Sequence, residues 1–159
     1  MVDFSELYRT YARDVHRFAL FLSGDPAVAD DIVSETFIRL WHARGRVDLT
    51  TVKSYLLAIA RNLFLLERRH ARRLTSVDER ARDERPGPDR SAQAHQDLQL
   101  VLAALQTLPE LDRAAVLLRA EESLSYEEIA AALGMTPVAA RVKVHRARLK
   151  LAEAMKGHS

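Results

Sequence analysis

The residues of this sequence best suited to chemistry are cations in the segment TPVAARVKVHRARLK, residues 136–150. This segment holds five Lys or Arg residues and no acid. Its small and apolar residues recur at helical spacing, so a helix here would bury one face and expose cations on the other. Such a surface suits a polyanion, and the cations that would neutralise its phosphates are Arg141, Lys143, Arg146 and Arg148.

A second basic segment, residues 53–73, holds six bases and one acid. Aromatic and amide side chains on a basic surface are typical of proteins that bind single-stranded nucleic acid. The residues with this character are Lys53, Tyr55, Arg61, Asn62, Arg68, Arg69, Arg72 and Arg73. The alternative interpretation of both segments is two ordinary solvated helix faces.

Three carboxylates, Asp30, Asp31 and Glu35, could in principle serve acid–base catalysis or bind a metal. No histidine follows at ligand spacing and no glycine-rich phosphate loop accompanies them, so a partner-binding face is favoured. The six histidines are scattered and no nucleophile constellation occurs. We therefore expect no enzyme activity, metal, cofactor or small-molecule substrate.

The composition sets the frame in which these residues must be positioned. The chain has 159 residues, 48% hydrophobic, with no cysteine and a formal net charge of +2. It has no apolar run of membrane-spanning length and no secretory leader pattern at its beginning. A cytoplasmic protein without membrane insertion and without disulfides is expected.

Hydrophobic periodicity predicts helices throughout, and no strand pattern appears. Helices are expected over residues 4–22, from Pro26 to about 41, from about 51 to 73, over 98–105, after Pro109, and on both sides of Gly134. Asp25-Pro26 and Thr136-Pro137 fit helix starts, and Ser125 with Glu128 fits a capping box. Residues 42–51 are expected to form a turn.

Residues 75–95 are almost wholly polar and contain two prolines and a glycine, which indicates a linker. We therefore predict an all-α fold with two small helical domains, residues 1–74 and 97–159, joined by a flexible linker over 75–96. In the second domain, helix, glycine turn and basic helix form a helix-turn-helix, which places its second helix in a DNA major groove.

Three segments in this order resemble the extracytoplasmic-function (ECF) sigma factors of bacterial RNA polymerase. DPAVADDIVSETFIRLW resembles the core-polymerase-binding segment of that family, and KSYLLAIARNLFLLERRHARR resembles the segment that melts and binds the minus-ten element. The stretch from residue 108 to 151 resembles the domain that binds the minus-thirty-five element. The resemblance spans nearly the whole chain outside the linker.

The resemblance implies roles for particular residues. The residues expected to contact core polymerase are Asp30, Asp31, Glu35, Phe37, Leu40 and Trp41, with a core position as the alternative for Phe37 and Leu40. Residues 42–51 would capture a flipped minus-ten base, lined by Arg44, Arg46 and Asn62, beside the basic segment over 53–73. Arg141, Val142, His145 and Arg146 would face the minus-thirty-five duplex, where Val142 would prefer a thymine methyl group.

The partners implied by the resemblance are core RNA polymerase, promoter DNA and an anti-sigma factor. Two alternatives remain open at the level of sequence. One is a stand-alone helix-turn-helix regulator that binds a duplex without polymerase. The other is an RNA- or protein-binding interaction protein in which the basic clusters contact neither promoter element.

Overall fold

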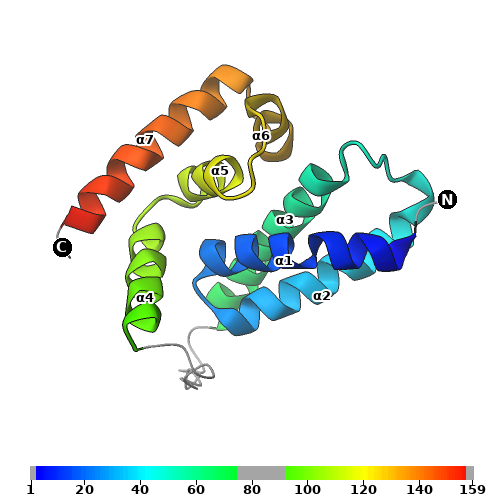
Figure 1. Ribbon diagram of the computed structural model, residues 1–159, viewed down its shortest axis with the longest axis horizontal. Helices are drawn as coiled ribbons and strands as arrows, with labels where there is room; N and C mark the ends of the chain where they lie inside the picture. The colour runs from blue at the N-terminus through cyan, green and yellow to red at the C-terminus, as the bar shows by residue number, and fades with distance from the viewer. Residues whose placement is uncertain (1–2, 75–91, 157–159) are drawn as a thin grey trace.

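The computed structural model describes residues 3–74 and 92–156, and every regular element in these ranges is a helix (Figure 1). The first range holds α1 (Phe4–Ser23), α2 (Pro26–Ala43), the 3-10 helix η1 (Arg44–Arg46) and α3 (Val52–Leu74). The second holds α4 (Ala92–Gln106), α5 (Glu110–Ala120), α6 (Tyr126–Leu133) and α7 (Pro137–Lys156). The predicted all-α fold is confirmed.

Local sequence signals set the helix ends in the first range. Gly24 adopts a left-handed φ of 72° and its N–H donates to the Leu20 carbonyl at 2.7 Å, which closes α1. The Asp25 carboxylate then accepts the N–H groups of Ala27 and Val28, with Pro26 in the first turn of α2. The helix start predicted at Asp25-Pro26 is present.

The helix-turn-helix forms by the same local rules. Ser125 and Glu128 make a reciprocal capping box at the start of α6, with distances of 3.1 and 2.9 Å. Gly134 ends α6 with a left-handed φ of 70°. The Thr136 hydroxyl accepts the Ala139 N–H at 3.1 Å at the start of α7.

The start of α4 differs from the prediction. The helix begins at Ala92, so residues 92–96, expected in the linker, are helical. Gln93 donates to the Asp97 carboxylate at 3.0 Å, an i,i+4 pair that supports this polar first turn. The rest of the expected linker, residues 75–91, lies outside the described residues.

The first three helices pack against one another around a hydrophobic core. Val15, Phe18 and Leu22 of α1 are fully buried there, as are Leu40 of α2 and Leu56 of α3. In the second range α5 is the central helix, because seven of its residues are buried and it contacts α4, α6 and α7.

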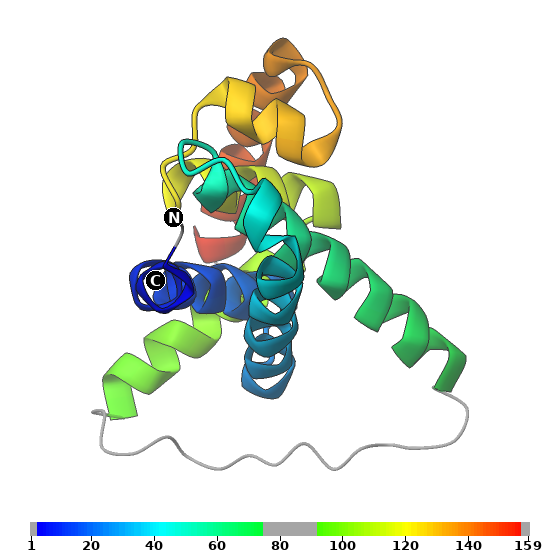
Figure 2. The same cartoon turned by 90° about the vertical axis from the view of Figure 1, so that its right-hand side faces the viewer.

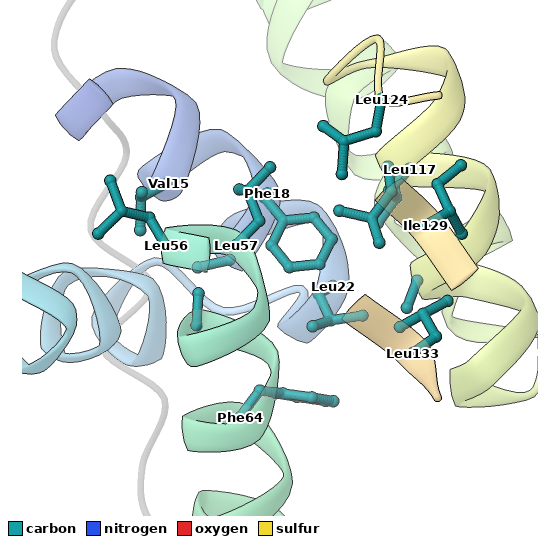
Figure 3. Packing of buried hydrophobic residues seen from close by; sticks show 14 of the residues in the cluster. Val15, Phe18, Leu22, Leu56, Leu57, Phe64, Leu117, Leu124, Ile129 and Leu133 are labelled. Atoms are coloured by element: carbon teal, nitrogen blue, oxygen red, sulfur yellow. The ribbon is translucent and has the colours of Figure 1, made fainter. Parts of the chain in front are cut away.

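The buried residues of the two halves form one continuous hydrophobic cluster rather than two separate cores. Helices α5 and α6 contact α1 and α3 respectively (Figures 1 and 2). Figure 3 shows Phe18, Leu22 and Leu57 on one side of this contact and Leu117, Leu124, Ile129 and Leu133 on the other. We call this contact of α1 and α3 with α5 and α6 the junction.

Two polar side chains beside the junction are paired with main-chain carbonyls. The buried guanidinium of Arg113 donates to the Leu22 carbonyl at 2.6 Å and to the Leu105 and Leu108 carbonyls at 3.0 Å. The Gln106 amide also donates to the Leu22 carbonyl, at 3.4 Å. The C-terminal end of α1 is thereby attached to the α4–α5 corner.

Candidate nucleic-acid interface

The basic helix α7 has the two faces that its sequence predicts. Ala140, Val144 and Ala147 are fully buried against the rest of the domain. The opposite face, which we call the outer face of α7, carries exposed side chains: Arg141, Val142, His145, Arg146 and Arg148. Val142 is 47% exposed, so an apolar β-branched side chain does lie within the basic surface.

Arg141 is held in place by an aromatic contact that sequence reasoning missed. Its guanidinium lies 4.8 Å from the centroid of the Tyr126 ring, and Arg119 lies 4.6 Å from the same ring. Arg119 also donates to the Leu124 carbonyl at 3.0 Å. Cation–π contacts of this kind orient a guanidinium while leaving its donors available.

Lys143, also expected to bind DNA, lies closer to the protein interior than its neighbours. Its ammonium donates to Asp112 Oδ1 of α5 at 3.1 Å, and Lys150 donates to Oδ2 at 3.3 Å. Burial would raise the pKa of Asp112, but the two lysines outweigh it and hold that pKa below its usual value. Lys143 therefore helps attach α7 to α5.

A hollow of about 410 Å³ lies in the turn between α2 and α3, where the sequence predicts capture of a base. Arg46 and Tyr55 line it, together with Ala43, Val47, Asp48 and Thr51. Hydrogen bonds from the Thr50 hydroxyl and N–H lower the pKa of Asp48 and fix the loop. The sequence does not indicate that Asp48 lines a site, because a lone acid in a turn is common and has no functional spacing to another residue.

The other two expected lining residues are placed elsewhere. The Arg44 guanidinium lies 3.9 Å from the centroid of the Trp41 ring and donates to the Trp41 carbonyl at 2.7 Å. Asn62 is exposed on α3 but does not line the hollow. The hollow therefore offers fewer polar side chains to a base than expected. Its large side chains are one arginine, Arg46, and one tyrosine, Tyr55.

The cations of α3 divide into two groups. Arg69, Arg72 and Arg73 are exposed near its C-terminal end, and the partly buried Arg68 lies 5.5 Å from the Phe64 ring. Lys53 and Arg61, which we call the inner cations, face the second half of the chain. Arg61 forms a bidentate pair with Glu110 at 2.7 and 2.8 Å, and Lys53 donates to the Glu122 carbonyl at 2.8 Å.

Helix α2 presents a mixed surface. Asp30, Asp31 and Glu35 are exposed, with Asp30 3.1 Å from His16 Nε2 and Glu35 3.7 Å from Arg39. Trp41 is 45% exposed and packs edge-on against Phe4. Exposed Tyr8 and Ile38, which the sequence did not single out, add further apolar area on this half of the molecule.

Phe37 and Leu40, expected to contact a partner, are buried instead. They are 3% and 0% exposed and belong to the hydrophobic core, because they lie on the face of α2 that packs against its neighbours. Their place in the structure supports a packing role.

Across residues 3–74 and 92–156, no group of acids and histidines is arranged to hold a metal ion.

No helix within the described ranges has the length and apolar character needed to cross a membrane.

Comparisons with known proteins identify relatives of both halves. Residues 7–74 match the family "Sigma-70 region 2" and residues 98–151 match "Sigma-70, region 4". The whole chain aligns at 38% identity with the ECF RNA polymerase sigma factor SigE of Mycolicibacterium smegmatis, and it spans 64% of that relative's length. It is 33% identical to the RNA polymerase sigma factor CarQ of Myxococcus xanthus, with 94% of this chain and 87% of CarQ aligned.

Among solved structures, the sigma factor RpoE from Bartonella quintana, in complex with the anti-sigma factor NepR, superposes with a TM-score of 0.82. The identity is 27%, and 99% of each chain is covered. CnrH, in complex with the cytosolic domain of CnrY, shares the fold with a TM-score of 0.73 at 24% identity, over 98% of this chain and 89% of that one.

Proposed function

Because the chain belongs to the ECF branch of the sigma-70 family, we propose that it is a sigma factor that directs RNA polymerase to promoters. It binds core polymerase, recognises minus-ten and minus-thirty-five elements and initiates DNA-templated transcription. The observation that supports this most strongly is the presence of two cationic surfaces, one in each matched region. The protein acts in the cytoplasm by binding alone and catalyses no reaction itself.

Core polymerase binds the exposed face of α2 in this proposal. Asp30, Asp31 and Glu35 supply negative charge, and Trp41 supplies a large half-exposed ring at the end of the same helix. Acids and an exposed aromatic ring on one helix suit a basic partner surface, where charge sets the encounter rate and burial of the ring supplies affinity. Phe37 and Leu40 keep the helix packed from behind.

The minus-ten strand binds along α3 and the hollow at η1. Removing a base from a duplex costs a few kcal/mol, so an opened strand needs a pocket that holds the base and cations that hold its phosphates. Arg46 and Tyr55 provide the pocket, with stacking on the tyrosine ring. The cationic end of α3 and the inner cations extend the track for the backbone.

The minus-thirty-five duplex binds the outer face of α7. Arg146 and Arg148 neutralise phosphates, while Arg141, Val142 and His145 lie near the helix start and reach base edges. Val142 contacts a thymine methyl, the apolar feature that the major groove offers.

An anti-sigma factor is the proposed regulator. The support is the RpoE relative, whose solved structure is a complex with the anti-sigma factor NepR and which aligns over nearly all of both chains.

Transcription from defined templates tests the proposal. The purified chain is added to core RNA polymerase with a library of promoter fragments, and the transcripts are sequenced. We expect start sites that core polymerase alone does not give, preceded by shared minus-ten and minus-thirty-five sequences. Duplex binding without any new start site would identify a stand-alone helix-turn-helix regulator instead.

A further inference from the structure

Two cations proposed to bind the minus-ten strand already have anionic partners within the chain. Arg61 of α3 forms a fork with both oxygens of the Glu110 carboxylate. The Arg61 and Glu110 side chains are 13% and 12% exposed, so this pair is largely removed from water. A DNA phosphate would meet the guanidinium with the same bidentate geometry, because guanidinium recognises carboxylate and phosphate oxygens alike.

The other inner cation, Lys53, has carboxylates nearby but no bidentate partner. The Glu122 side chain is fully buried, and its carboxylate accepts two hydrogen bonds from Arg17, at 2.9 and 3.0 Å. Lys53 donates to the Glu122 carbonyl at 2.8 Å and lies 3.8 Å from the carboxylate. Asp14 completes the cluster, 2.8 Å from Arg17 and 3.9 Å from Lys53.

The apolar contacts around these pairs explain how the two halves are held together. Leu117, Leu124 and Ile129 pack at the junction with Phe18 and Leu57 of the first half (Figure 3). Buried ion pairs contribute little net stability, since desolvation offsets their attraction. The apolar side chains therefore provide the adhesion, and the carboxylates decide what the inner cations contact.

The outer face of α7 contrasts with this arrangement. It has exposed arginines at positions 141, 146 and 148, and the junction does not cover it. Among the described residues, the second half of the chain contacts the proposed minus-ten track at the inner cations, in the middle of α3.

We propose that Glu110 and Glu122 are built-in substitutes for DNA phosphates, which keep the inner cations occupied until the two halves of the chain separate. The closed chain binds a minus-thirty-five duplex with its outer face but binds single-stranded minus-ten DNA weakly. Separation at the junction frees Lys53 and Arg61 and completes the track. This inference rests on the proposed sigma function, because it assumes that α3 binds the opened strand.

The test compares single-strand and duplex binding by the full free chain. Variants Glu110→Gln, Glu122→Gln and the double variant keep side-chain size but remove the anion. Glu121→Gln is the matched control, since it removes the same charge from an exposed neighbour of Glu122. The probes are a fluorescently labelled oligo-dT and a labelled duplex that carries a minus-thirty-five element selected in the transcription experiment.

We expect Glu110→Gln, and the double variant with it, to bind oligo-dT roughly five- to tenfold more tightly, because Arg61 loses its charged partner and a buried cation left without one disfavours the closed form. Duplex binding should change no more than in Glu121→Gln. Equal gains on both probes, or equal gains in the control, would mean that only net charge had changed, and the inference would fail.

A distance measurement keeps the inference testable if affinity is altered by poor folding. The chain has no cysteine, so Ser34→Cys on α2 and Ala152→Cys on α7 introduce the sole attachment sites for two spin labels. The closed form predicts one narrow distance distribution, which broadens to longer distances in the Glu110→Gln and Glu122→Gln double variant. An unchanged distribution together with unchanged oligo-dT binding overturns the substitute-phosphate inference.

The same samples distinguish this failure from failure of the proposed function. If wild type directs transcription but the variants gain no single-strand affinity, the sigma function stands and the inference falls. If wild type does not direct transcription and the variants gain no affinity for oligo-dT, both fall together.

Discussion

The two cationic surfaces of this protein differ in what surrounds them. The outer face of α7 is built on one side of a helix whose other side is buried, so its arginines project into solvent. The inner cations of α3 lie in the junction, paired with carboxylates from α5 and the following turn. The difference shows that a basic residue's exposure depends on how the other half of the chain packs as well as on its face of its own helix.

The largest expected effect is on stability, and it distinguishes a residue buried at the junction from one exposed on α7. Phe18 is fully buried at the junction, and its truncation in Phe18→Ala should lower the free energy of unfolding by about 3–5 kcal/mol through lost burial and a cavity. Leu149, 60% exposed on α7, is the control, and Leu149→Ala should cost less than about 0.5 kcal/mol. Urea unfolding measures both, and similar losses would contradict the assignment of the two sides.

Glu122 at the junction and Asp112 beneath α7 should affect the free energy of unfolding in opposite ways as the pH changes. Burial raises the pKa of Glu122, although Arg17 and Lys53 act against this effect and Asp14 adds to it. A folded-state pKa above the unfolded value contributes stability at low pH, and this contribution is lost as pH rises through the folded pKa. Asp112 has a lowered pKa, so its contribution is present above the unfolded pKa and is lost as pH falls through the folded one.

Unfolding free energies at several pH values between about 2 and 8 test this contrast. Relative to Glu122→Gln, wild type should gain stability as the pH falls through the raised pKa of Glu122. Relative to Asp112→Asn, wild type should lose stability only at the acidic end of the series, below the ordinary pKa of an aspartate. Parallel pH profiles for the two variants would contradict the opposite pKa directions.

A smaller effect concerns phosphate binding by the free chain. Arg146→Ala should lower the slope of duplex affinity against salt concentration by about 1, because one phosphate contact and its counterion release are lost. Arg61→Ala should leave that slope unchanged, since Arg61 is paired with Glu110 in the junction. Fluorescence anisotropy over a salt series measures both slopes, and a matching drop in the two variants would remove the distinction between open and covered cations.

The smallest effect is on base preference. Val142→Ser should reduce the preference for thymine at one minus-thirty-five position by about 0.8 kcal/mol, the value of one buried methyl-sized group. Val101→Ser, at a 38% exposed position on α4 and outside the proposed DNA surface, is the control. Selection from a randomised duplex library measures the preference, and an unchanged profile would leave Val142 as an ordinary exposed valine.

The parts of this fold that could be predicted from sequence depend on neighbours a few residues apart. Gly24, Asp25 and Pro26 end one helix and start the next, and Ser125 with Glu128 caps α6. The faces of α7 follow from helical spacing in the same way. Each of these features is decided within one or two turns, so the sequence shows it directly.

The remaining features depend on contacts between distant segments. Arg17 and Glu122 are 105 positions apart, and nothing in either neighbourhood indicates that they meet. Arg61 appeared equivalent to Arg69 from spacing alone, yet one is covered and the other exposed. The sequence alone does not decide whether Phe37 and Leu40 contact a partner or pack in the core, because an apolar residue on α2 is compatible with both roles.

The continuous hydrophobic cluster has a consequence for temperature. Separation of the halves exposes apolar side chains to water, so the opening reaction carries a positive heat-capacity change. Its free energy is therefore curved in temperature, and the apolar adhesion weakens on cooling. Cooling should therefore increase the fraction of chains in which the junction is open and Lys53 and Arg61 are exposed.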